Sequence, residues 1–95
     1  MSRATRIEYP GALYHAMGRG VGGTQAFPED EHRERFLRFV GQTVESGDLL
    51  VHAYCLMTTH YHLLLETPRG GLSRWMQGIL GGYGQWFNIR QERSG

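Results

Sequence analysis

Residues 49–67 read LLVHAYCLMTTHYHLLLET, and this stretch decides the fold of the chain. Two apolar runs of strand length lie on either side of a short polar break at Thr58-Thr59, and the second run opens with His60 and His62. Apolar runs of this length around a short polar break predict a β-hairpin. We therefore expect two antiparallel strands, with both histidines at the start of the second.

The spacing of the two histidines suggests a metal site. Residues two apart on a strand point to the same face, so His60 and His62 should stand side by side, roughly 6–7 Å apart, with Tyr61 on the opposite face. Neutral imidazole is the commonest metal ligand, and two such rings can converge on one divalent cation. A His-x-His pair also occurs by chance, so spacing alone leaves the metal interpretation and an ordinary structural role both open.

The region before the hairpin predicts one strand and one glycine-rich loop. The segment Leu13 to Met17 reads as a strand entered through a Pro10-Gly11 turn, with His15 on the same face as its two ends. His15 would lie near the histidine pair if this strand neighbours the hairpin, although a lone strand histidine is more often structural. Residues 18–23 contain four glycines but neither the lysine nor the spacing of a phosphate-binding loop, so we expect a flexible loop there.

Helical spacing appears in two further segments. Pro28, followed by three acidic residues, marks the start of a helix over roughly 29–46 with one apolar stripe, and Gly47 ends it. Ser73 is the expected N-cap of a second helix that keeps apolar spacing for about five turns. Four glycines within 78–84 interrupt that helix at about 1 kcal/mol each relative to alanine, so it should depend on tertiary packing.

Composition limits the function classes. A chain of 95 residues makes a single domain, and its net charge of +1 is too small to indicate nucleic acid by itself. All ten basic residues are arginine, which suits phosphate contacts but also follows from codon bias. Cys55 is the only cysteine, which excludes an internal disulfide, and its place in an apolar strand predicts a small buried side chain in a cytoplasmic protein. No apolar run is long enough to span a membrane.

The order of the expected elements is strand, helix, strand, strand, helix. It predicts an α+β domain over residues 1–95 with a ferredoxin-like, split β-α-β sheet and two helices on one face. The last strand of that fold is missing from the expected elements.

Four segments also resemble one protein family. Residues 51–57 and 60–68 together resemble the His-hydrophobic-His motif of the HUH single-tyrosine transposases, in particular the REP-associated branch of the insertion-sequence transposases. Residues 6–15 are similar to the opening strand of that family, residues 33–37 to its first helix, and residues 72–74 with 83–88 to its second. The four matches occur in the family's order and cover most of the chain.

The resemblance implies a metal-dependent enzyme that nicks and rejoins single-stranded or hairpin DNA. His60 and His62 match the two histidine ligands of a Mg²⁺ or Mn²⁺ ion that polarises the scissile phosphate. Arg19 and Gly20 match an Arg-Gly pair that lies close to DNA, and His15 is a third candidate for the DNA site. Relatives work as homodimers, which predicts the same for this chain.

The family's nucleophilic tyrosine has no counterpart in this sequence. In relatives it lies on a later C-terminal helix, after a further strand, and that helix also carries the third metal ligand. Among the five tyrosines present, Tyr83 is the only one on an expected helix, but it falls in the apolar stripe and at a non-catalytic family position. It is a poor candidate for the nucleophile, and packing in the core is the main alternative.

Three hypotheses follow. The chain is a truncated transposase that binds DNA and metal without completing strand cleavage, a non-catalytic nucleic-acid-binding module, or a metal-stabilised remnant. The truncated form should leave one sheet face bare, with Tyr54, Leu56, Leu63 and Leu65 facing the helices and Cys55, His60, His62 and Leu64 facing away. Such a bare face and an unpaired edge strand favour a homodimer joined through the sheet.

Overall fold

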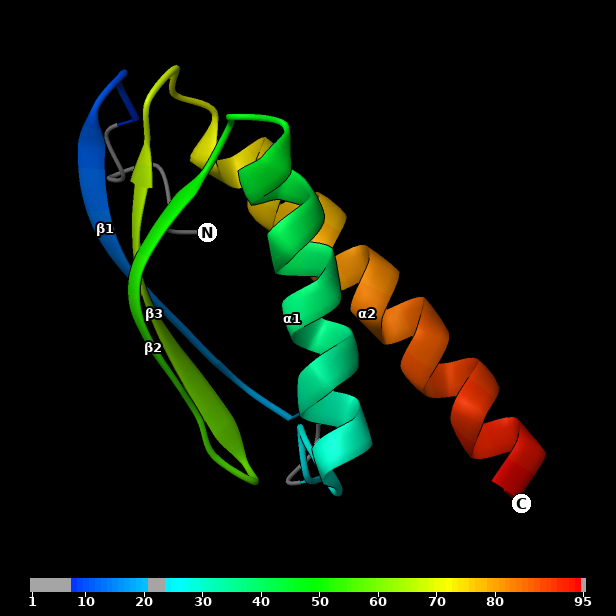
Figure 1. Ribbon diagram of the computed structural model, residues 1–95. Helices are drawn as coiled ribbons and strands as arrows, with labels where there is room; N and C mark the ends of the chain where they lie inside the picture. The colour runs from blue at the N-terminus through cyan, green and yellow to red at the C-terminus, as the bar shows by residue number, and fades with distance from the viewer. Residues whose placement is uncertain (1–7, 21–23, 95) are drawn as a thin grey trace.

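A computed structural model describes residues 8–20 and 24–94 of the chain. The elements follow in the order β1 (Ala12–Arg19), α1 (Asp30–Glu45), β2 (Leu50–Leu56), β3 (His60–Thr67) and α2 (Leu72–Ser94). β3 lies between β1 and β2 and runs antiparallel to both, in the strand order β1-β3-β2. Both helices lie on one side of the sheet (Figure 1). The α+β, split β-α-β architecture predicted from the sequence is thus confirmed.

The central hairpin forms where the sequence predicts it. The Met57 N–H donates to the His60 carbonyl at 2.8 Å and closes the turn over Thr58-Thr59. β2 then pairs with β3 from Leu56 opposite Tyr61 onward, and a bulge between Val51 and Ala53 shifts the register by one residue. Because paired residues share a face, this register fixes which side chains of both strands meet the helices.

The hydrophobic core lies between the sheet and the two helices. Alternation along β3 sends Tyr61, Leu63 and Leu65 to the helix side, where all three are buried. Phe36 and Val40 of α1 meet them from above, which confirms the predicted apolar stripe. Within the described residues, the main core cluster consists of Phe27, Phe36, Val40, Leu49, Tyr61, Leu63, Leu65, Leu72, Met76, Ile79 and Tyr83.

Tyr54 points to the helix side of the sheet, as predicted, and is 55% exposed because it stands on the edge strand β2. Two other details of the sequence-based prediction are wrong. Cys55 is exposed and not buried, because it points to the face away from both helices. Ser73 is not an N-cap: α2 begins at Leu72, and the Glu8 carboxylate accepts hydrogen bonds from both the backbone N–H and the hydroxyl of Ser73.

Helix α2 runs without interruption through its four glycines. Gly82 has a packing reason, because a Cβ there would stand only 2.6 Å from the ring of Phe39 on α1. A carboxylate of Glu31 on α1 also accepts hydrogen bonds from the guanidinium of Arg90 on α2, at 2.8 and 3.1 Å. Contacts with α1 therefore offset part of the low helix propensity. No helix in the described residues is long and apolar enough to cross a membrane.

Candidate functional site

The candidate site lies on the open face, which we define as the side of the sheet away from α1 and α2. Alternation along β1 and β3 points His15, Met17, Arg19, His60 and His62 to this face. In the register between the two strands, Arg19 lies opposite His60 and Met17 lies opposite His62. Two segments more than 40 residues apart in the sequence thus contribute to one surface.

Three imidazole rings form a continuous cluster on the open face. The rings of His60 and His62 have their centroids 5.1 Å apart and stand nearly perpendicular, at 85°. His15 stacks on the other side of His62, also at 5.1 Å between centroids, and its Nε2 lies 2.9 Å from His62 Nδ1. The structure therefore brings His15 next to the predicted pair, as the sequence allowed but did not require.

The hydrogen bonds leave the same ring nitrogen of each predicted ligand available. Nδ1 of His60 lies 3.1 Å from the Thr59 hydroxyl, and Nδ1 of His62 is engaged by His15. Within residues 8–20 and 24–94, Nε2 of neither ring has a hydrogen-bond partner. Both Nε2 atoms can therefore serve as metal ligands once the ring proton sits on Nδ1.

The donor set suits a weakly held cation. In the described part of the chain, no three His, Cys, Asp or Glu side chains are arranged to hold a metal ion. Imidazole nitrogens are best suited to Zn²⁺, Cu²⁺, Fe²⁺ and Ni²⁺, whereas Mn²⁺ and Mg²⁺ both prefer oxygen, so the pair would hold either of the two predicted ions weakly. His15 uses its own Nε2 on His62, so it acts on the pair from one side and is not a third ligand in this arrangement.

The predicted Arg19-Gly20 pair divides into two roles. Arg19 is exposed on the open face beside His60, where its guanidinium is accessible to a phosphate. Local packing explains the glycine at position 20, because a Cβ there would collide with the Thr24 carbonyl. The Gly20 N–H donates to the Thr59 carbonyl at 3.0 Å. Only Arg19 therefore presents a side chain to the site.

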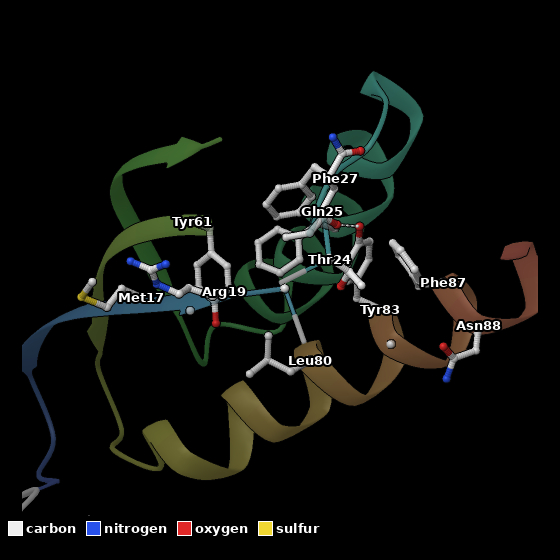
Figure 2. A pocket seen from close by; sticks show the side chains of 15 residues that line it. Met17, Arg19, Thr24, Gln25, Phe27, Tyr61, Leu80, Tyr83, Phe87 and Asn88 are labelled. Carbon is white, nitrogen blue, oxygen red and sulfur yellow. Dashed lines mark hydrogen bonds between the residues drawn. The ribbon is translucent and has the colours of Figure 1, made fainter. Parts of the chain in front are cut away.

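None of the five tyrosines accompanies the histidines. Tyr83 is buried on α2, and its hydroxyl donates to the Ala26 carbonyl at 2.6 Å, on the helix side of the sheet (Figure 2). Burial raises the pKa of Tyr83 far above its ordinary value, which opposes formation of a nucleophilic phenolate. Tyr14, Tyr54 and Tyr61 point to the helix side of the sheet. Tyr9 precedes β1, at the end of that strand far from His60.

One feature of the open face was not predicted from the sequence. His52, at the bulge of β2, places its Nε2 3.0 Å from a carboxylate oxygen of Glu66, so this fourth histidine is already paired. The described strand residues of the open face include no Phe, Tyr or Trp, which are the side chains that stack bases in sheet-based RNA-binding domains.

Comparison with known proteins gave no match to a protein family, to a curated protein or to a solved structure.

Proposed function

We propose that this chain is a DNA-binding domain of the HUH single-tyrosine transposase type, in which His60 and His62 hold a divalent cation against a phosphate of single-stranded or hairpin DNA. The observation that supports this proposal most is the orientation of the two rings. Both stand on an exposed sheet face with Nδ1 engaged, while Nε2 of neither ring has a hydrogen-bond partner among the described residues. A cation shared by the two rings needs these two nitrogens to be available.

Each side chain has a defined part in this proposal. A bound cation would supply Lewis-acid polarisation of a phosphate oxygen. His60 and His62 would hold it as neutral imidazoles, while Thr59 and His15 fix the ring orientations through the two Nδ1 atoms. Arg19, opposite His60, would pair with a neighbouring phosphate through its planar guanidinium.

The proposal is for binding without strand cleavage by the tyrosines of this chain. Tyr83 is the only helical tyrosine, and its buried, hydrogen-bonded hydroxyl lies on the opposite side of the sheet from the histidines. A second copy of the chain is the proposed protein partner, joined through the open face. We expect no covalent protein–DNA adduct with Mn²⁺ or Mg²⁺, and an adduct that disappears in Tyr83→Phe would contradict this.

Titration with Mn²⁺, followed by the loss of its free electron-spin resonance signal, tests the metal site. Wild type should bind one ion weakly, because two ligands leave most of the coordination sphere to water. His60→Ala and His62→Ala should each weaken binding by about tenfold or more. The matched control is His52→Ala, which removes a histidine of the same face that is already paired with Glu66 and should bind as wild type does. Identical titrations of wild type and His60→Ala would show that the site is assigned wrongly.

Fluorescence anisotropy with a labelled hairpin oligonucleotide tests the DNA part. Binding should increase with Mn²⁺ in wild type but not in His60→Ala. Arg19→Gln should weaken binding with and without Mn²⁺ and reduce its dependence on salt, since it removes one phosphate contact. Absence of any hairpin or single-strand binding by wild type at low salt would refute DNA as the ligand.

A further inference from the structure

A cavity of about 710 Å³ lies on the helix side of the sheet, between the end of β1, residues 24–27 and α2 (Figure 2). Its volume falls in the range of small-molecule sites. Five aromatic rings line it, with Leu80 on the α2 side. The rings belong to Phe27, Phe36, Tyr61, Tyr83 and Phe87.

One hydroxyl that lines this cavity makes no hydrogen bond with the described residues. The side chain of Tyr61 is only 7% exposed, and its hydroxyl is directed into the cavity (Figure 2). In contrast to Tyr83, which donates to the Ala26 carbonyl, Tyr61 makes no hydrogen bond with any described residue. A phenol keeps its proton at neutral pH, so the hydroxyl is a donor. The hydroxyl is therefore available to donate to an acceptor atom of a bound molecule.

The α2 wall of the cavity is kept open by a glycine. A Cβ at Gly84 would meet no atom within 4 Å, so close packing does not require a glycine there, in contrast to Gly82 beside Phe39. Glycine in a helix costs about 1 kcal/mol relative to alanine. At Gly84 the missing side chain leaves room that a larger residue would take from the cavity.

We infer that this cavity binds a flat heteroaromatic molecule of one or two fused rings, whose ring acceptor atom accepts a hydrogen bond from the Tyr61 hydroxyl. The aromatic rings suit a planar apolar ring, and the Tyr61 hydroxyl favours a ring that carries an acceptor. Among the described residues, no acidic side chain lines the cavity, and Arg19 is the one cationic residue that does. The ring would come either from a free small molecule or from a base unstacked from a nucleic-acid strand.

This inference is independent of the histidine site. Tyr61 stands between His60 and His62 in β3 and points to the other side of the sheet, so the cavity and the histidine cluster lie back to back. His60→Ala should therefore lose Mn²⁺ while keeping the aromatic ligand. If one of the two sites binds nothing in its test, the proposal for the other site still stands.

Quinoline and naphthalene form a matched pair of probes, because they share shape and differ in one ring-nitrogen acceptor. Ligand-observed saturation-transfer NMR should show that wild type binds quinoline about fivefold more tightly than naphthalene. Tyr61→Phe keeps the ring in the core and should remove this preference. Gly84→Leu should abolish binding of both probes. Gly78→Leu is its control, since Gly78 is also a helical glycine with free space but does not line the cavity.

Thermal unfolding first checks that each variant is folded, so that a loss of ligand binding can be assigned to the cavity. Wild type that binds neither probe, Gly84→Leu that binds as tightly as wild type, or Tyr61→Phe that keeps the preference would each overturn the inference. Addition of a short mixed-sequence oligodeoxynucleotide then identifies the source of the ring. Displacement of quinoline indicates a base of a strand, and retention of quinoline indicates a free small molecule.

Discussion

At the scale of single residues, the contact between His15 and His62 decides which tautomer the metal would meet. A neutral imidazole carries one N–H, so His62 can offer a lone pair at Nε2 only when its proton is on Nδ1. That Nδ1–H must then donate to His15 Nε2, 2.9 Å away, which requires the proton of His15 to be on its own Nδ1. His15 thereby positions the proposed ligand without touching the ion, as second partners of metal-bound histidines commonly do.

Two substitutions separate this hydrogen bond from the ring stacking. His15→Phe keeps a ring stacked against His62, but the new side chain cannot accept the hydrogen bond from His62 Nδ1. We expect this variant to bind Mn²⁺ about tenfold more weakly. His15→Gln loses the stacking but retains an acceptor oxygen, and it should bind Mn²⁺ nearly as wild type does. The ¹⁵N shifts of the His62 ring report its tautomer directly and should change in His15→Phe. Equal Mn²⁺ affinities in both variants and wild type would mean that His15 does not position His62.

At the scale of elements, the contacts of each α2 glycine determine what it contributes. Gly78 has open space around its Cα, whereas Gly82 is in direct contact with the ring of Phe39 on α1. The propensity gain from alanine is about 1 kcal/mol at either position, but overpacking costs about 1–3 kcal/mol where a neighbour must move.

The two alanine variants should therefore differ in sign. Gly78→Ala should raise the free energy of unfolding by up to about 1 kcal/mol. Gly82→Ala should lower it by about 1 kcal/mol, because displacement of the Phe39 ring outweighs the gain in helix propensity. Urea unfolding followed by circular dichroism measures both. A stabilised Gly82→Ala would show that α2 can move away from α1 at little cost.

A second element-scale contact joins the loop after α1 to the turn after β3. Asp48 accepts hydrogen bonds from the Ser46 hydroxyl at 2.7 Å and from the Arg69 guanidinium at 2.8 Å. The Ser46 bond, followed by Arg69, lowers the pKa of Asp48 below its ordinary value of 3.8. A lowered folded-state pKa stabilises the fold above the unfolded-state pKa, and this stabilisation disappears as the pH falls through the folded-state pKa.

Acid should therefore weaken the wild type more than a variant that lacks this carboxylate. We expect the stability of wild type to fall below about pH 4, and the fall to be smaller in Asp48→Asn. Urea midpoints at pH 6 and pH 3 measure the difference. Parallel losses in the two proteins would mean that Asp48 has the same pKa in the folded and unfolded chain.

At the scale of the whole molecule, the open face leaves apolar side chains in solvent. Leu13 is 63% and Met17 is 61% exposed on β1, and in the described residues β1 pairs only with β3. Bare apolar area and an unpaired strand edge both favour association.

We expect a homodimer joined through the open face, with the histidine clusters of both copies near the interface. Sedimentation at micromolar concentration should give about twice 10.8 kDa. Leu64→Glu, on the open face, should shift the chain toward monomer, whereas Ile89→Glu, an equally exposed apolar position on α2, should not. A clean monomer of the wild type would contradict this prediction.

The sequence by itself determined the features that depend on neighbouring residues. Alternation and helical spacing act over a few residues, so they predicted the hairpin, both helices, and the opposite directions of Tyr61 and the pair His60 and His62. They also predicted that Tyr83 packs in the core.

Only the tertiary structure decided what depends on which elements meet. The register of β1 on β3 places His15 against His62, across 47 residues of sequence, and no local pattern encodes that register. Alternation gives the face of a strand residue but not whether a helix covers it, so Tyr54 points to the helix side and is still exposed. Cys55 was expected to be buried and is exposed. The cavity above Tyr61 likewise exists only because β1, α2 and residues 24–27 come together in space, since packing over long sequence distances sets its walls.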